Sequence, residues 1–152
     1  NLRRVLMRRA DRGARVHGQD RAQSAAWVDA LVERYVRSGL VDDKRYAEAA
    51  AASLRRRGAS SRRIRQKLAQ KGVDADIADA ALKESGGAGD AADLAAAVKL
   101  ARKRRLGPFG DPKQRRDRRL KDMAALARAG FSYAIARRVV DAVDEGELEE
   151  DA

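Results

Sequence analysis

The chain has 152 residues and carries 34 lysines and arginines against 23 acidic residues, which gives a formal net charge of +11. Self-repulsion of this size favours a function with an anionic partner. No run approaches the roughly 20 apolar residues of a membrane-spanning helix, and Asn1 to Arg9 is too charged for a signal sequence, so we expect no membrane partner. Cysteine is absent, which excludes disulfides and fits a cytoplasmic location.

Apolar residues recur at intervals of three and four along the chain, and alanine, arginine and leucine are abundant. No segment alternates with a period of two, so the sequence predicts an all-α fold without strands. In chain order we expect helices at residues 1–12, 23–38, 43–57, 61–71, 75–84, 91–105, 113–129 and 133–145. Five aromatic side chains lie at core spacing, which favours packing over stacking on bases. They are Trp27, Tyr35, Tyr46, Phe131 and Tyr133.

The turns between the predicted helices repeat one short pattern. Gly72 is followed by a capping residue, Asp74, and 58 residues later Gly130 is followed in the same way by Ser132. A looser copy surrounds Gly39. Glycine at such a position ends a helix in the left-handed conformation, and aspartate or serine then caps the next helix. The spacing therefore predicts internal repeats.

Short helices in internal repeats bury their apolar faces on their neighbours, which predicts an elongated array of three-helix units. We expect an incomplete, atypical first repeat, a glycine-rich joint between the other two, and a break at residues 106–112 within the third. The acidic end of the chain is expected to fray. The predicted divisions are residues 1–41 for the first repeat, 42–85 for the second, 86–90 for the linker, 91–145 for the third and 146–152 for an acidic tail.

The sequence contains no catalytic, cofactor-binding or metal-binding constellation. His17 is the only histidine and cysteine is absent, so the common zinc ligand sets are excluded. The polar residues 13–20 around His17 are expected to form a loop. Asp42 and Asp43 are adjacent, so their carboxylates diverge and suit a helix cap and a first-turn charge. Residues 86–89 lack the lysine and hydroxyl of a phosphate-binding loop. We expect a protein that is not an enzyme and needs no cofactor.

Two runs of basic residues are the feature of the sequence that indicates a function. Residues 55–71 contain no acidic residue, and residues 99–121 contain only Asp111 and Asp117. Ordinary solvated faces mix both signs, so these runs favour an anion-binding surface over a solvated face. Arginine outnumbers lysine, which suits two-pronged contacts to phosphate or carboxylate without a choice of base sequence. The candidate surface residues are Arg55, Arg56, Arg57, Arg62, Arg63, Arg65, Lys67, Lys71, Arg102, Lys103, Arg104, Arg105, Arg115, Arg116, Arg118 and Arg119.

Two segments resemble the central signature of the RecX family. Residues 39–47 read GLVDDKRYA, and residues 63–73 read RIRQKLAQKGV, a basic helix that closes on lysine, glycine and an apolar residue. Residues 126–133 are similar to the ending of that family's third repeat. The resemblance spans about residues 31–143, whereas residues 12–21 lack the short helix-turn-helix spacing of the family's first repeat.

The resemblance implies three tandem three-helix repeats in a curved, modular rod. It further implies a monomeric cytoplasmic regulator of DNA repair, recombination and the SOS response, which binds the RecA filament near its DNA. Such a protein would inhibit the recombinase and its ATPase, with the basic surface contacting RecA or the phosphates of single-stranded or double-stranded DNA. Two alternatives stay open from the residues themselves: a general, sequence-independent DNA-binding helical protein, and, less favoured, an enzyme acting on nucleic acid.

Overall fold

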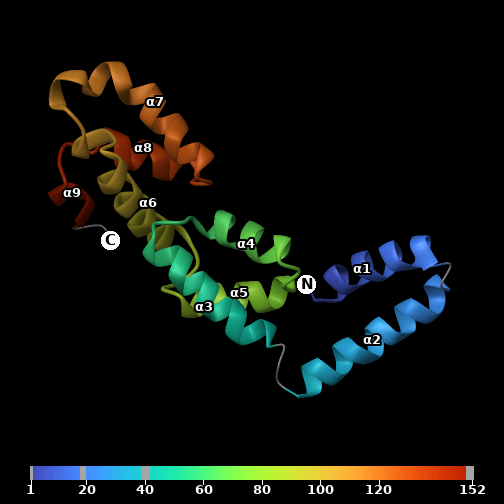
Figure 1. Ribbon diagram of the computed structural model, residues 1–152. Helices are drawn as coiled ribbons and strands as arrows, with labels where there is room; N and C mark the ends of the chain where they lie inside the picture. Colours follow the sequence, from blue (N-terminus) through green and yellow to red (C-terminus); the bar gives the residue numbers. More distant parts are fainter. Residues whose placement is uncertain (1, 18–19, 39–41, 150–152) are drawn as a thin grey trace. The chain divides into compact units, whose positions relative to one another are not determined.

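The computed structural model describes residues 2–17, 20–38 and 42–149 (Figure 1). Within these ranges the chain is helical, with two short 3-10 turns and no strand, so the predicted all-α fold is confirmed. The chain divides into two compact units, Asn1–Asp43 and Lys44–Ala152. In the described ranges, no helix is long and apolar enough to cross a lipid bilayer.

In the first unit, α1 (Leu2–His17) and α2 (Arg21–Arg37) form a helical hairpin (Figure 1). The Arg3 guanidinium contacts the Asp29 carboxylate at 2.5 Å and links the two helices. The expected loop over residues 13–20 is wrong in its first part, because α1 continues to residue 17. Glycine inside a helix costs only about 1 kcal/mol, and the residues around Gly13 are good helix formers. The side chain of His17 lies outside the described part of the chain.

The second unit begins with three helices, α3 (Asp43–Arg56), α4 (Ser61–Gln70) and α5 (Ala75–Glu84), which we call the central group. Their apolar faces meet in one core. Alanines on α3 and α5 let the helices approach closely, and larger residues, mainly on α4, fill the space between them. The buried core residues are Ala47, Ala51, Ile64, Leu68, Val73, Ala78, Ala81 and Leu82.

The remaining helices, which we call the C-terminal group, are α6 (Asp90–Arg104), α7 (Arg115–Arg128), α8 (Tyr133–Asp141) and α9 (Gly146–Glu149). The predicted break after α6 is present and contains two 3-10 turns. The expected frayed acidic end differs from the structure: α9 forms there, with Leu148 only 1% exposed. A single apolar side chain that is buried in the core thus anchors this otherwise acidic segment.

The turns at Gly72 and Gly130 behave as predicted, and the looser copy around Gly39 lies outside the described residues. Gly72 and Gly130 both have positive φ, +79° and +94°, which glycine adopts without the steric cost of a Cβ. After each glycine, the next amide donates to the carbonyl five residues back, at 3.1 Å for Val73 and 3.2 Å for Phe131. The cap side chain of Ser132 then accepts from the amide of Ile135. Local sequence therefore determines where these helices end.

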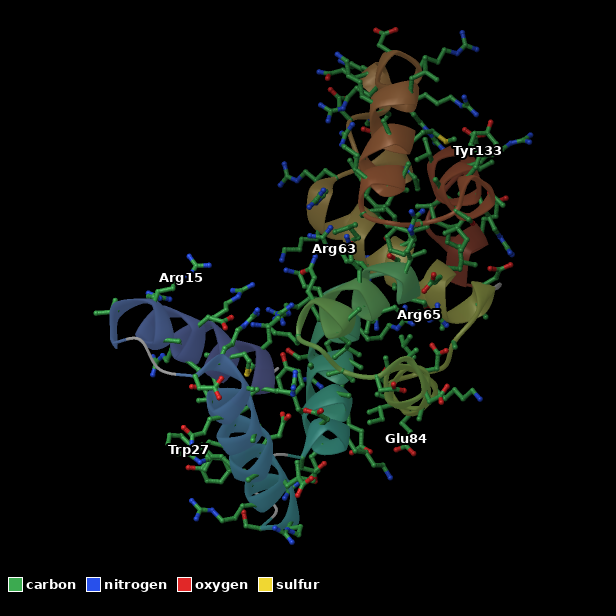
Figure 2. The ribbon with its side chains drawn as sticks, turned by 90° about the vertical axis from the view of Figure 1, so that its right-hand side faces the viewer. Arg15, Trp27, Arg63, Arg65, Glu84 and Tyr133 are labelled. Atoms are coloured by element: carbon green, nitrogen blue, oxygen red, sulfur yellow. The ribbon has the colours of Figure 1, made fainter. Side chains whose placement is uncertain are left out.

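Three of the five aromatic residues expected in the core are exposed: Trp27 by 64%, Tyr46 by 45% and Tyr133 by 68%. Phe131 is buried as expected, and Tyr35 is half-buried. Periodicity places an aromatic residue on the apolar side of a helix, but a neighbouring helix must cover that side to bury it. Within the first unit, α2 has α1 as its helical neighbour, which leaves the ring of Trp27 outside their interface (Figure 2).

Close backbone contacts fix the central group against the C-terminal group. A Cβ added at Gly58, in the turn before α4, would lie 3.0 Å from the carbonyl oxygen of Ala96 in α6. Ser60 Oγ donates to the carbonyl oxygen of Ala129 at 2.8 Å, and a Cβ at Gly130 would lie 2.6 Å from that hydroxyl. The turn between α3 and α4 therefore packs closely against both α6 and the end of α7. This junction positions the candidate site.

Candidate anion-binding site

Arg55 is placed in the interior, so its prediction as a surface contact is wrong. The residue is only 7% exposed, and its guanidinium contacts Asp93 Oδ1 of α6 at 2.7 Å. It also donates to Ser61 Oγ at 2.7 Å and to the carbonyl oxygens of Ala59 and Gly87. The Ser61 amide and hydroxyl both donate to the same Asp93 oxygen. Arg55 therefore links α3, α4 and α6 as a structural ion pair.

A sequence signal for this burial exists. Arg55 follows Ala47 and Ala51 at intervals of four, and both alanines are fully buried, so the three residues share the inner face of α3. The same residue also begins the basic run at residues 55–71, which by itself predicts exposure. The partner, Asp93, is 38 residues away in sequence, and no local pattern identifies it.

Other predicted surface residues have partners within their own groups. Arg65 contacts Asp79 of α5 at 2.6 Å. Arg119 makes two hydrogen bonds of 2.7 Å to Asp141, which lower the pKa of Asp141 and raise that of Arg119. Arg115 donates to the carbonyl oxygens that follow α8. Arg65 and Arg119 thus match the solvated-face alternative, since the chain supplies their counter-ions, and Arg115 is held by backbone carbonyl oxygens.

Arg102 belongs with this compensated set. Its guanidinium pairs with Glu145 and also lies 5.6 Å from the ring centroid of Phe109. Both contacts attach the end of α6 to later parts of the C-terminal group. The acidic segment after α8 thus neutralises a cation that the sequence had assigned to partner binding.

Five other cations meet at the junction of the two groups. A pocket of about 430 Å³, which we call the junction pocket, has an apolar floor and a rim of five cations. Within the part of the chain that the structure describes, no carboxylate lines this pocket. The rim cations are Arg57, Arg63, Lys103, Arg104 and Arg128, and the floor contains Leu54, Gly58, Ala59, Leu100, Ala125 and Ala129.

A smaller hollow of about 190 Å³ adjoins the junction pocket and shares Arg63, Arg128 and Ala129 with it. Arg62 and Gln66 complete its polar lining, and it too lacks a carboxylate. The pair Arg63 and Arg128 therefore lies at the boundary of two concave, positively charged spaces. We call the two spaces together the junction groove.

Helix ends explain part of this charge but not all of it. Lys103 and Arg104 occupy the last turn of α6, and Arg128 the last turn of α7, where cations oppose the negative end of the helix dipole. Arg62 and Arg63 occupy the first turn of α4, which contains no acidic residue. Cations at this positive end of the helix dipole are repelled by it, which destabilises the helix by about 0.3–1 kcal/mol each. The positive N-terminal end of α4 and its two arginines together add positive potential to the groove.

Positions on α4 separate two roles. Arg63 faces the groove and α7, whereas Arg65 turns toward α5 (Figure 2). Two residues of helix rotate a side chain by about 200°, so neighbouring arginines of one run reach different surroundings. A contiguous basic run is therefore divided by the helix into a groove-facing part and an internally paired part.

The junction groove brings together part of the predicted surface: Arg57, Arg62, Arg63, Lys103 and Arg104. Arg57 also donates to the Ser53 hydroxyl and carbonyl, which leaves its charge uncompensated. The remaining predicted residues are exposed outside the groove, and they are Arg56, Lys67, Lys71, Arg105, Arg116 and Arg118.

Sequence reasoning missed Arg128. It stands alone between alanines, outside both basic runs, and only the docking of α7 onto the turn before α4 brings it to the groove. As for metals, the described residues contain no group of three or more His, Cys, Asp or Glu side chains that could hold an ion.

Several proteins of a known family are similar to this chain in sequence. The family model described as RecX, second three-helix domain, matches residues 42–82, which includes Arg55, Arg62 and Arg63. A protein named regulatory protein RecX from Myxococcus xanthus is 48% identical over 92% of this chain and 74% of its own length. Proteins of the same name from Agrobacterium fabrum and Trichlorobacter lovleyi are 42% identical over 66% of the chain and 32% identical over 81%. These alignments cover 51% and 79% of the relatives. No solved structure matched.

Proposed function

We propose, from the premise that this chain belongs to the RecX family of regulatory proteins, that it binds the RecA nucleoprotein filament and inhibits its ATP turnover and recombinase activity. The observation that supports the proposal is the junction groove, whose five rim cations face no carboxylate among the described residues. We place this activity in the cytoplasm and assign no catalytic step to the protein itself.

The proposed mechanism is a shift between filament states. A binding protein changes an assembly only by as much as it prefers one state over another. Cations fixed on helix ends present a rigid pattern to carboxylates or phosphates of the filament, and arginine forms two parallel hydrogen bonds to either group. A filament state that presents matching anions would be stabilised, and its turnover would fall.

The test is ATP turnover by RecA filaments on single-stranded DNA. We expect the full chain to reduce turnover when added at fewer molecules than RecA subunits, because each bound molecule restrains neighbouring subunits. Unchanged turnover at saturating protein would contradict the proposal.

A matched pair of variants tests the groove. Arg62→Glu with Arg63→Glu reverses two groove charges, and we expect it to abolish the inhibition. Lys83→Glu with Lys121→Glu reverses the same amount of charge at exposed lysines outside the groove. This control should inhibit almost as well as the unaltered protein, and equal loss in both pairs would remove the groove from the proposal.

A second candidate is a general, sequence-independent DNA-binding protein, which the uncompensated cations also favour. In that case binding to DNA alone would be as strong as binding to the filament. Its affinity would fall about a thousandfold between about 50 and 200 mM salt if six or more phosphates are contacted. Weak binding to free DNA together with strong binding to the filament would reject this candidate.

A further inference from the structure

We infer that the junction groove binds two consecutive nucleotides of a single nucleic-acid strand, with their linking phosphate between Arg63 and Arg128. The inference rests on the proposed function only in its choice of an anionic partner. It adds a ligand class and a position for each part of that ligand.

The shape of the groove supports a strand over an isolated anion. Two hollows of about 430 and 190 Å³ share a boundary formed by Arg63 and Arg128. Each hollow also has cations that the other lacks: Arg57, Lys103 and Arg104 in the larger, and Arg62 in the smaller. Cations therefore line each hollow as well as their shared boundary, which suits successive phosphates of one backbone.

The floor of the larger hollow supports an unpaired base. Leu54, Leu100 and three alanines supply apolar surface inside a ring of cations. Proteins that bind single strands combine a basic groove along the backbone with apolar surface for the bases. No aromatic ring lines the floor, so the base is buried without stacking and without selection of its identity. In a duplex the bases are paired and stacked, and the floor would stay uncovered.

The groove is also preorganised. Gly58, Ser60 and Gly130 hold the two groups in close backbone contact beneath it, and the buried pair of Arg55 and Asp93 joins the same elements. A ligand therefore does not need to assemble the site. Binding energy goes into contacts, because little ordering is required of the protein.

The experiment measures binding of the full chain, without RecA, to fluorescent oligothymidylate at low salt. Arg63→Gln with Arg128→Gln should weaken binding about tenfold and reduce the slope of log affinity against log salt by about 0.7, the value for one lost phosphate contact on a single strand. Lys83→Gln with Lys121→Gln removes the same charge outside the groove and should change binding by less than about twofold. An equal effect of both pairs would overturn the inference.

Competing probes separate the possible ligands. An abasic strand of equal length, a duplex, ATP and oligoglutamate of equal charge should each compete several-fold less well than the single strand. Equal competition by the abasic strand or duplex would overturn base burial, and equal competition by ATP or oligoglutamate would overturn the nucleic-acid strand. Because RecA is absent, failure here leaves the inhibition of filament turnover as a separate result. Helicity of each variant is measured to exclude unfolding.

Discussion

Two regions of the second unit use the same residue type in opposite ways. Beneath the junction, Arg55 is enclosed and neutralised by Asp93. On the rim above, Arg63 and Arg128 are exposed, and no carboxylate from residues 2–17, 20–38 or 42–149 lines the pocket beside them. Arg55 and Arg57 are two residues apart, but Arg55 lies on the inner face of α3 and Arg57 lies in the turn that follows α3.

This difference shows that only exposed cations without a counter-ion in the chain can form a partner surface, whatever the basic composition of a segment. A buried charge is stable only with a fixed counter-charge and hydrogen bonds, and Arg55, which is 7% exposed and paired with Asp93, is not accessible to a ligand. An exposed arginine keeps its hydration and can exchange water for phosphate or carboxylate at small cost. Substitutions in the first region should change stability, and substitutions in the second should change binding.

The largest expected effect is that of Asp93→Ala. It leaves the buried Arg55 charge without its counter-ion, so the free energy of unfolding should fall by about 3–5 kcal/mol. Denaturant unfolding followed by circular dichroism measures the change. Asp90→Ala is the control, since Asp90 is an exposed residue of the same helix turn and should cost no more than about 1 kcal/mol. Similar losses in both variants would remove the distinction.

Gly130→Ala should lower the free energy of unfolding by about 2 kcal/mol. The substitution requires a left-handed conformation for alanine and places its Cβ 2.6 Å from the Ser60 hydroxyl. Gly13→Ala is the contrasting variant, because Gly13 lies within α1 and a Cβ there meets nothing within 4 Å. It should be neutral or stabilising by up to about 1 kcal/mol. Thermal and denaturant unfolding compare the two.

Ser60→Ala should cost about 1 kcal/mol, because it removes the cap of α4 and the hydrogen bond to Ala129. The same variant should weaken nucleic-acid binding only to the extent that the junction loosens. Urea unfolding and strand binding are measured on one sample. A large loss of binding without a loss of stability would assign Ser60 to the ligand instead of the junction.

The smallest effect is a pH dependence in the C-terminal group. Hydrogen bonds from Arg119 lower the pKa of Asp141. The stabilisation by this pair is therefore present above the unfolded carboxyl value of about 4 and is lost as the pH falls through the lowered folded value. Arg119→Gln should reduce stability at pH 6 and converge with the unaltered protein in strong acid. Lys121→Gln should leave the acid dependence unchanged, and denaturant unfolding from pH 2 to 6 follows both.

Local sequence predicted the helices of the second unit well, because helix ends depend on neighbours a few residues apart. Gly72 with Asp74 and Gly130 with Ser132 act through contacts within six residues, which a sequence displays directly. The same locality misled at Trp27. Helical spacing places the ring on an apolar side, but burial needs a second helix over that side.

By itself, the sequence determined an all-helical chain, the repeated turn that ends its helices, the family signature and the excess of positive charge. Only the tertiary structure decided which cations are available. Arg55 meets Asp93 across 38 residues, and Ser60 meets Ala129 across 69, so their roles arise from docking between helices and not from either segment alone. Charge acts through distance and burial in space, and both are set only when the helices pack.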